Sequence, residues 1–68
     1  MKIEYDKEAD AGYIYLVDEI KEGEAAKTIE LDPNIILDFE KNGKLLGIEV
    51  LNASKVLSKD VLLKSNIN

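Results

Sequence analysis

Apolar residues occupy every second position on both sides of Asn42-Gly43, and this alternation predicts a β-hairpin with a defined register. Asn-Gly favours a two-residue type I′ loop, because both central residues of that turn need a positive φ. The register then forms apolar cross-strand pairs on one face: Phe39 with Leu46, Leu37 with Ile48, and Ile35 with Val50. A slip of one residue would turn Asp38 and Glu49 towards the core, so the turn and the pattern agree on one register.

Similar patterns predict further strands before this hairpin. Residues 12–17 are apolar on both faces, which is typical of an interior strand, whereas the charged residues 18–24 predict a solvated loop. Turn-forming residues at 32–34 predict a second hairpin, and a three-residue loop there would place Leu31 opposite Ile35. The loop geometry stays open, because the residue before Pro resists the αR conformation that the commonest loop of this length needs. The additional strands are expected at residues 2–6, 12–17 and 28–31.

The pattern changes after the central hairpin, where helix-forming residues replace the alternation. Leu57 and Val61 are four residues apart and would share one helical face. Ser54 and Ser58 can each act as an N-cap, by accepting a hydrogen bond from a backbone N–H. The sequence therefore predicts one short helix, or two helical turns broken near Ser58, followed by fraying of residues 65–68.

These elements predict an α+β fold: a small antiparallel β-sheet meander of four to five strands, with a short C-terminal helix packed on one face. The 68 residues are expected to form a single compact β-rich domain over residues 1–68. Its core is expected to be thin, because folding of a domain of this size buries only about 60% of the surface that the unfolded chain exposes. Since one helix covers one face, we expect a two-fold homodimer to cover the other. The alternative is a monomer in which loop 18–24 folds over that second face. The expected interaction surface comprises Tyr13, Tyr15, Ile36, Leu45 and Leu51.

Composition narrows the chemistry. His and Cys are absent, which removes the usual zinc, haem and iron–sulfur ligands, so we expect no metal site and no cofactor. Fourteen acidic residues against nine basic ones, all Lys, give a net charge of −5. This balance opposes nucleic-acid binding, and it suits either solubility or a basic protein partner reached by electrostatic steering. Residues 1–6 lack the apolar run of a signal peptide and no segment is long enough to span a bilayer, so we expect a cytoplasmic protein without a membrane partner.

One group of carboxylates resembles a calcium loop. Asp6, Glu8 and Asp10 have the spacing of the first three acidic ligands of an EF-hand. Ala11 and Val17, however, occupy the loop positions at which an EF-hand needs Gly and Glu. We therefore interpret the segment as a turn, in which Asp6 and Asp10 accept hydrogen bonds from nearby backbone N–H groups.

A second pair of carboxylates, Asp38 and Glu49, falls on one face of the central hairpin. Paired carboxylates can divide acid and base roles in hydrolysis, but a flat two-stranded surface offers little pocket. We interpret them as solvated charges that suppress edge-to-edge association, and we assign no catalytic residue. Tyr5, Tyr13 and Tyr15 have acidic neighbours, which argues against a nucleic-acid stacking platform and favours packing in a core or interface with satisfied hydroxyls.

Three segments resemble the family called domain of unknown function 2283, which consists of small bacterial and archaeal proteins. They are Tyr5–Ile14, Ile36–Phe39 and Gly43–Lys55. The chain departs from that family's pattern at Gly12, where an apolar residue is usual, and at Ser58, where Pro is common. The resemblance implies a compact β-sheet with a short C-terminal helix. It brings no established activity and no catalytic residues, although an acidic, antitoxin-like partner of a small basic protein would be in keeping with it.

Two classes of function remain open from the sequence. The one we favour is a non-enzymatic protein-interaction module, an acidic partner that assembles with or neutralises a basic protein. The alternative is a small enzyme or ligand-binding protein, with a site at a homodimer interface that uses Asp and Tyr. The absence of His and Cys, the small size and the negative charge favour the interaction module.

Overall fold

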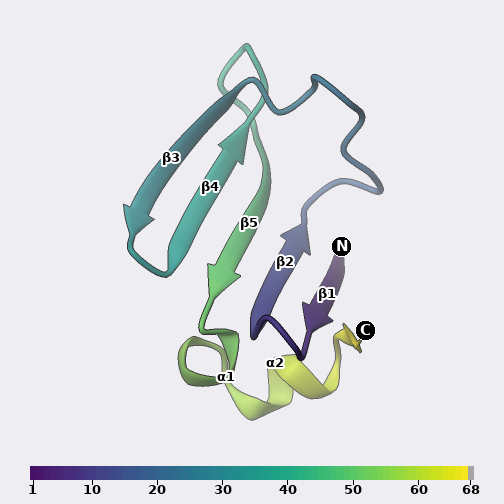
Figure 1. Ribbon diagram of the computed structural model, residues 1–68. Coiled ribbons are helices and arrows are strands. Elements are labelled where there is room, and N and C mark those ends of the chain that lie inside the picture. The colour runs from purple at the N-terminus through teal and green to yellow at the C-terminus, as the bar shows by residue number, and fades with distance from the viewer. Residues whose placement is uncertain (68) are drawn as a thin grey trace.

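Strands form most of the regular secondary structure, and the computed structural model describes residues 1–67. Within these residues a single six-stranded sheet has the order β3-β4-β5-β2-β1-β6. Two short helices, α1 and α2, follow β5 and lie at one end of the sheet (Figure 1). The elements are β1 (Lys2–Asp6), β2 (Ala11–Tyr15), β3 (Lys27–Asp32), β4 (Ile35–Phe39), β5 (Leu45–Leu51), α1 (Ala53–Val56), α2 (Lys59–Leu63) and β6 (Asn66–Ile67).

The sheet confirms the predicted α+β fold class, with six strands in place of the expected four to five. All neighbouring strands pair antiparallel except β6, which is parallel to β1. The hairpin β1–β2 and the meander β3–β4–β5 join side by side, because β2 pairs with β5 rather than with β3. The expected fraying of residues 65–68 is wrong for β6, whose Asn66 and Ile67 pair with Glu4 and Tyr5. Asn68 lies outside the described residues.

The turn of the β4–β5 hairpin differs from the predicted type I′ loop. Glu40 N–H donates to the Lys44 carbonyl at 2.8 Å, and Gly43 N–H donates to the Glu40 carbonyl at 2.9 Å, so the loop has three residues. Gly43 has a φ of 90°, whereas Asn42 does not adopt a positive φ. This arrangement, in which Gly alone takes the left-handed position, is the common three-residue alternative to the two-residue loop.

The longer loop shifts the register only next to the turn. The predicted pairs Ile35–Val50 and Leu37–Ile48 are confirmed, but the predicted pair Phe39–Leu46 is wrong. Phe39 lies opposite Leu45, and a bulge beyond this pair restores the predicted register. Leu46 remains in the core, where it is only 2% exposed. The apolar pattern therefore determines the register of the strand bodies, and the bulge absorbs the extra loop residue.

The β3–β4 hairpin also has a β-bulge next to its loop. Asp32, rather than the predicted Leu31, lies opposite Ile35, so the loop holds only Pro33 and Asn34. The Asp32 carboxylate accepts a hydrogen bond from Asn34 N–H at 2.8 Å, which closes the loop as an Asx turn. The register shifts between Glu30 and Asp32. Leu31 falls in that bulge and is 66% exposed.

The C-terminal segment forms two helical turns, the second of the two predicted forms. Leu57 is extended and ends α1, and the Ser58 hydroxyl caps α2 by accepting from Val61 N–H at 3.3 Å. The predicted N-cap role of Ser58 is confirmed. Ser54 lies inside α1, whose N-cap is instead Asn52, with a φ of 53° and no side-chain capping bond. No helix among the described residues is long and apolar enough to cross a membrane.

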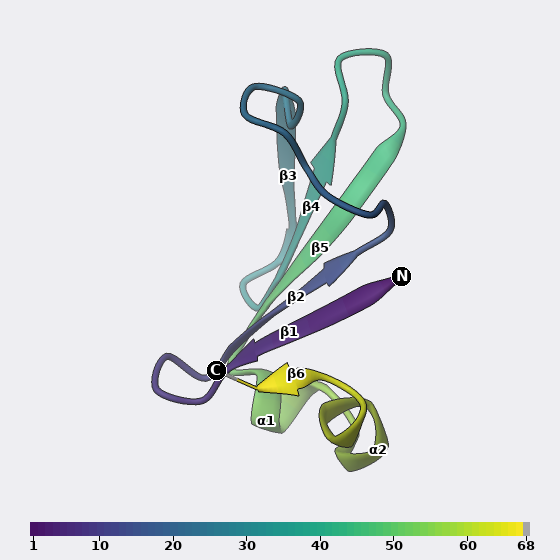
Figure 2. The ribbon, with the colours of Figure 1, turned by 90° about the vertical axis from the view of Figure 1, so that its right-hand side faces the viewer.

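The helices pack on the face of the sheet that carries Gly12 and Val50. A Cβ on Gly12 would lie 3.7 Å from both the Ala53 Cβ and a Leu57 methyl group. Figure 2 shows the helices beside the lower end of the sheet, with β3, β4 and β5 extending beyond them. The buried apolar side chains of the described residues are Leu46, Val50 and Ala53. The core is therefore small, and the helices cover only one end of the face that they pack on.

Candidate functional site

The two faces of the sheet differ in chemistry. Cross-strand partners share a face, so the register places polar and tyrosine side chains together on the side away from the helices, here called the tyrosine face. The apolar side chain of Ile36 also lies on this face. Two adjacent rows of the tyrosine face run Lys2, Tyr15, Gly47, Asp38, Thr28 and Glu4, Tyr13, Glu49, Ile36, Glu30.

A hydrogen-bonded cluster lies at the centre of the tyrosine face. The Tyr13 hydroxyl donates to Asp38 Oδ2 at 2.6 Å, and the Thr28 hydroxyl donates to Asp38 Oδ1 at 2.7 Å. A Cβ on Gly47 would lie only 2.5 Å from the Tyr13 ring, so the ring rests directly on the Gly47 backbone. The cluster thus links three strands, with the half-buried Asp38 as the shared acceptor.

The environment of Tyr13 keeps its hydroxyl protonated. Burial and the hydrogen bond to the Asp38 carboxylate raise the pKa of Tyr13 well above its usual value. A general base or nucleophile would need the opposite shift, towards neutrality. The cluster is therefore suited to fix the position of the tyrosine ring, and it does not activate Tyr13 as a base or a nucleophile.

Asp38 and Glu49 do share a face, as the sequence predicts, but Asp38 is not the solvated charge that we expect. Both of its carboxylate oxygens accept hydrogen bonds from side chains, one from Tyr13 of β2 across β5 and one from Thr28 of the adjacent strand β3. The two carboxylates are diagonal neighbours, because Asp38 pairs with Gly47 and Glu49 pairs with Ile36. With both oxygens engaged, Asp38 is poorly placed to exchange a proton with a substrate.

Tyr15 extends the aromatic surface next to Tyr13. The two ring centroids are 4.7 Å apart, and the rings are tilted by 53°. The Lys2 ammonium lies 4.5 Å from the Tyr15 ring centroid, and the Tyr15 hydroxyl donates a long hydrogen bond of 3.5 Å to Glu4. The face therefore already holds one ammonium over an aromatic ring, an arrangement that is attractive because the ring face carries negative charge.

A shallow hollow of about 190 Å³ borders this surface. It is lined by Tyr13 and by carboxylates of β1 and β5. A basic side chain that entered it would meet an aromatic ring and acidic groups together. The lining residues are Glu4, Asp6, Ala11, Gly12, Tyr13 and Glu49.

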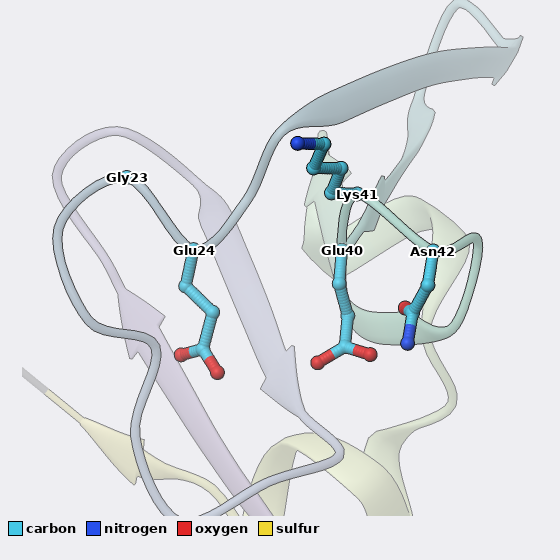
Figure 3. Close-up of a pocket in the computed structure, with 5 residues that line it drawn as sticks. All are labelled: Gly23, Glu24, Glu40, Lys41 and Asn42. Carbon is cyan, nitrogen blue, oxygen red and sulfur yellow. The ribbon is translucent and has the colours of Figure 1, made fainter.

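A larger hollow of about 590 Å³ lies elsewhere, between the β2–β3 loop and the β4–β5 turn. Figure 3 shows Glu24 and Glu40 on its two sides with their carboxylates turned the same way, and the Lys41 amine turned away from them. Glu24 already accepts a hydrogen bond from Lys21 N–H at 2.9 Å, so it closes its own loop. We prefer the smaller hollow as the candidate site, because tyrosine and several acidic groups converge there.

Asp6 and Asp10, whose spacing resembles a calcium loop but which we interpret as turn residues, have different structural roles. Asp6 accepts from the N–H groups of Glu8 and Ala9 at 3.0 and 3.2 Å, which confirms the predicted turn. Asp10 has a φ of 52°. The prediction that its carboxylate accepts from an N–H group close to it in the sequence is wrong. This carboxylate accepts instead from the Tyr5 hydroxyl at 2.7 Å and from the backbone and hydroxyl of Ser54 at 3.0 and 2.8 Å.

These bonds make Asp10 an anchor for α1. The Asp10 carbonyl also accepts from Ala53 N–H at 2.9 Å, so one residue satisfies two donors at the start of the helix. The hydrogen bond from Tyr5 has the largest effect on the pKa of Asp10 and lowers it, and the hydrogen bonds from Ser54 lower it further. In turn, the Asp10 carboxylate raises the pKa of Tyr5. No group of three or more acidic residues suited to a metal ion is present among residues 1–67.

Most of the predicted interaction surface is brought together. Tyr13 and Tyr15 share the tyrosine face with Ile36, and Leu51 lies two residues from Glu49 on the same side. Leu45 is separated from them, since it pairs with Phe39 beyond the bulge.

Thr28 and Gly47 are parts of the central cluster that the sequence pattern does not predict. A glycine inside a predicted strand was the available signal, because such a residue often marks a close approach by another group.

Fold and site together define a small, acidic α+β protein with one polar, tyrosine-bearing sheet face. The family described as Protein of unknown function (DUF2283) matches residues 2–54, and the chain belongs to that family. The uncharacterized protein MJ0789 of Methanocaldococcus jannaschii is 46% identical over 61 residues, which cover 88% of this chain and 47% of the relative. The chain thus spans about half the length of this relative. No solved structure matches the chain.

Proposed function

We propose that this protein is a non-enzymatic interaction module whose tyrosine face binds a basic protein. The observation that carries the proposal is the separation of charge between the faces. The two rows of the tyrosine face carry the carboxylates of Glu4, Glu30, Asp38 and Glu49 against the single ammonium of Lys2. Charge on one face, in a chain of net charge −5, steers a basic partner to that face.

The aromatic pair adds contact area to this electrostatic attraction. Tyr13 is held by Asp38, so its ring loses little conformational freedom when a partner binds. The Lys2–Tyr15 contact supports the same chemistry, since a lysine or arginine of a partner would find aromatic and acidic groups in a similar arrangement. A small basic protein, neutralised by this chain as a toxin is by an antitoxin, is the partner that this surface fits.

The experiment uses a lysine-rich synthetic peptide as the probe, with an uncharged peptide of equal length beside it. In amide-resonance titrations we expect the lysine peptide to shift residues of β1, β2 and β5 on the tyrosine face. The double variant Glu4→Gln/Glu49→Gln should weaken binding about fivefold or more at low salt. Its matched control is Glu19→Gln/Glu22→Gln, which removes the same charge from the exposed β2–β3 loop.

The control should change the affinity by less than about twofold, which distinguishes a located surface from a general effect of net charge. Equal weakening by both double variants, or shifts confined to the helices, would contradict the proposed face. A bound peptide that is released by the variants but not by added salt would contradict the electrostatic mechanism.

A further inference from the structure

A row of aliphatic side chains crosses the face opposite the tyrosines. The register places one residue from each of five adjacent strands side by side, and this set is here called the aliphatic row. Its members are Ile29, Leu37, Ile48, Ile14 and Ile3, in spatial order from β3 to β1. Each is β-branched or leucine, so the row is a continuous apolar strip across the sheet.

The protein itself leaves the aliphatic row open. None of its five members is buried, and Ile29 is 40% exposed. The buried apolar side chains of the described residues flank the row: Val50 and Ala53 near the helices, and Leu46 near the β4–β5 turn. The expectation that the C-terminal helix covers this face thus holds at one end only, because α1 and α2 together contain nine residues (four and five) and lie beside the lower end of the sheet (Figure 2).

The total surface area is consistent with a missing cover. The chain exposes 4875 Å². A compact monomer of this mass would expose about 4,300 Å² by the usual scaling of area with mass. The excess of about 600 Å² approaches the roughly 800 Å² that each partner contributes to an ordinary stable interface.

We infer that a second copy of the chain covers the aliphatic row, and that the protein is a face-to-face homodimer. The row is uncharged, so it offers no electrostatic complement to a basic or an acidic partner. It is suited to a surface of its own kind, since a two-fold interface places the same patch on both partners. Two twisted sheets pack in this way about 10 Å apart, with interdigitating aliphatic side chains.

The charge distribution favours the same arrangement. Two chains of net charge −5 repel each other, and the repulsion is smallest when their carboxylates are far apart. Face-to-face packing through the aliphatic row places Glu4, Asp38 and Glu49 on the two outer surfaces of the dimer. The tyrosine faces would stay free for partners, so this dimer differs from the one expected from sequence, which used the tyrosine side.

The test combines sedimentation equilibrium of the whole chain at 1–100 μM with one variant on each face. Wild-type protein should show a dimer mass over most of this range. Ile29→Lys places a charge in the aliphatic row at an exposed edge-strand position, and it should raise the dimer dissociation constant at least tenfold. Glu30→Gln alters the net charge by the same amount on the opposite face and should leave the dimer intact.

A measurement that needs no variant guards against misfolding of Ile29→Lys. A mixture of differently isotope-labelled chains should show intermolecular methyl contacts among Ile14, Leu37 and Ile48. A wild-type monomer throughout the range would overturn the inference. So would a dimer whose intermolecular contacts involve Tyr13 and Tyr15, because that result would restore the tyrosine face as the interface.

Discussion

Gly47 has no side chain, and this leaves the space in which the Tyr13 ring lies. Tyr13 lies across the space that a Cβ of Gly47 would fill, and from there its hydroxyl reaches Asp38. Gly12 is the natural comparison, because it faces the helices and a Cβ there would meet its neighbours at 3.6–3.7 Å, an ordinary packing distance. The two strand glycines should therefore respond differently to the same substitution.

Gly47→Ala should displace the Tyr13 ring and break its hydrogen bond to Asp38, which we expect to lower the free energy of unfolding by about 1–2 kcal/mol. Gly12→Ala should leave stability unchanged or raise it by up to about 1 kcal/mol, because alanine restricts the unfolded chain. Urea unfolding measures both effects. Tyrosine absorbance at alkaline pH gives a separate readout, since the pKa of Tyr13 should return towards about 10 in Gly47→Ala. A raised Tyr13 pKa retained in that variant would contradict the arrangement.

At the scale of elements, the pairing of the strand bodies could be predicted from sequence, whereas the loop geometry of the two hairpins could not. Alternation decides which residues face the core over a whole strand, so Leu37 and Ile48 pair as expected. A turn depends on one or two residues with several permitted geometries of similar energy, and Asn42-Gly43 adopts the three-residue form. Contacts between distant parts of the chain could not be predicted either. The hydrogen bond between Asp10 and Ser54 spans 44 residues, and no local pattern specifies such a contact.

The link between Asp10 and α1 makes that helix sensitive to acid. Hydrogen bonds from Tyr5 and Ser54 place the pKa of Asp10 in the folded protein below its unfolded value. The stabilisation is therefore present above the unfolded pKa, near 3.9, and is lost as the pH falls through the folded pKa. Asp10→Ala should lower the melting temperature at pH 7, with a smaller loss for Ser54→Ala, which removes one of the bonds.

Thermal melts followed by circular dichroism between pH 7 and pH 2.5 test this assignment. Asp10→Asn keeps an acceptor and tolerates the left-handed backbone, so it should fold but show a weaker loss of stability below pH 4 than wild type. Asp18→Asn, at an exposed loop position, serves as the matched control and should follow the wild-type curve. An acid response identical in Asp10→Asn and wild type would show that Asp10 does not anchor the helix.

At the scale of the whole molecule, the sequence predicts an apolar face and a polar one, but not how far a helix reaches across them. The coverage depends on the break at Leu57, which shortens both helices and places them at one end of the sheet. Tyr13 and Ile36 were assigned to an interface because a fully covered apolar face was assumed. The extent of cover is a property of three-dimensional packing, and the apolar pattern of the helices does not contain it.

Self-association through the aliphatic row makes stability depend on protein concentration. Because only the folded chain dimerises, raising the concentration a hundredfold should raise the melting temperature, by about 10 °C for a dimer of this size. Ile29→Lys should abolish the dependence, and Glu30→Gln should preserve it. Differential scanning calorimetry at 5 and 500 μM, at a fixed scan rate, measures the shift. A wild-type melting temperature that is the same at both concentrations would mean that each chain unfolds alone, with its aliphatic row exposed to water.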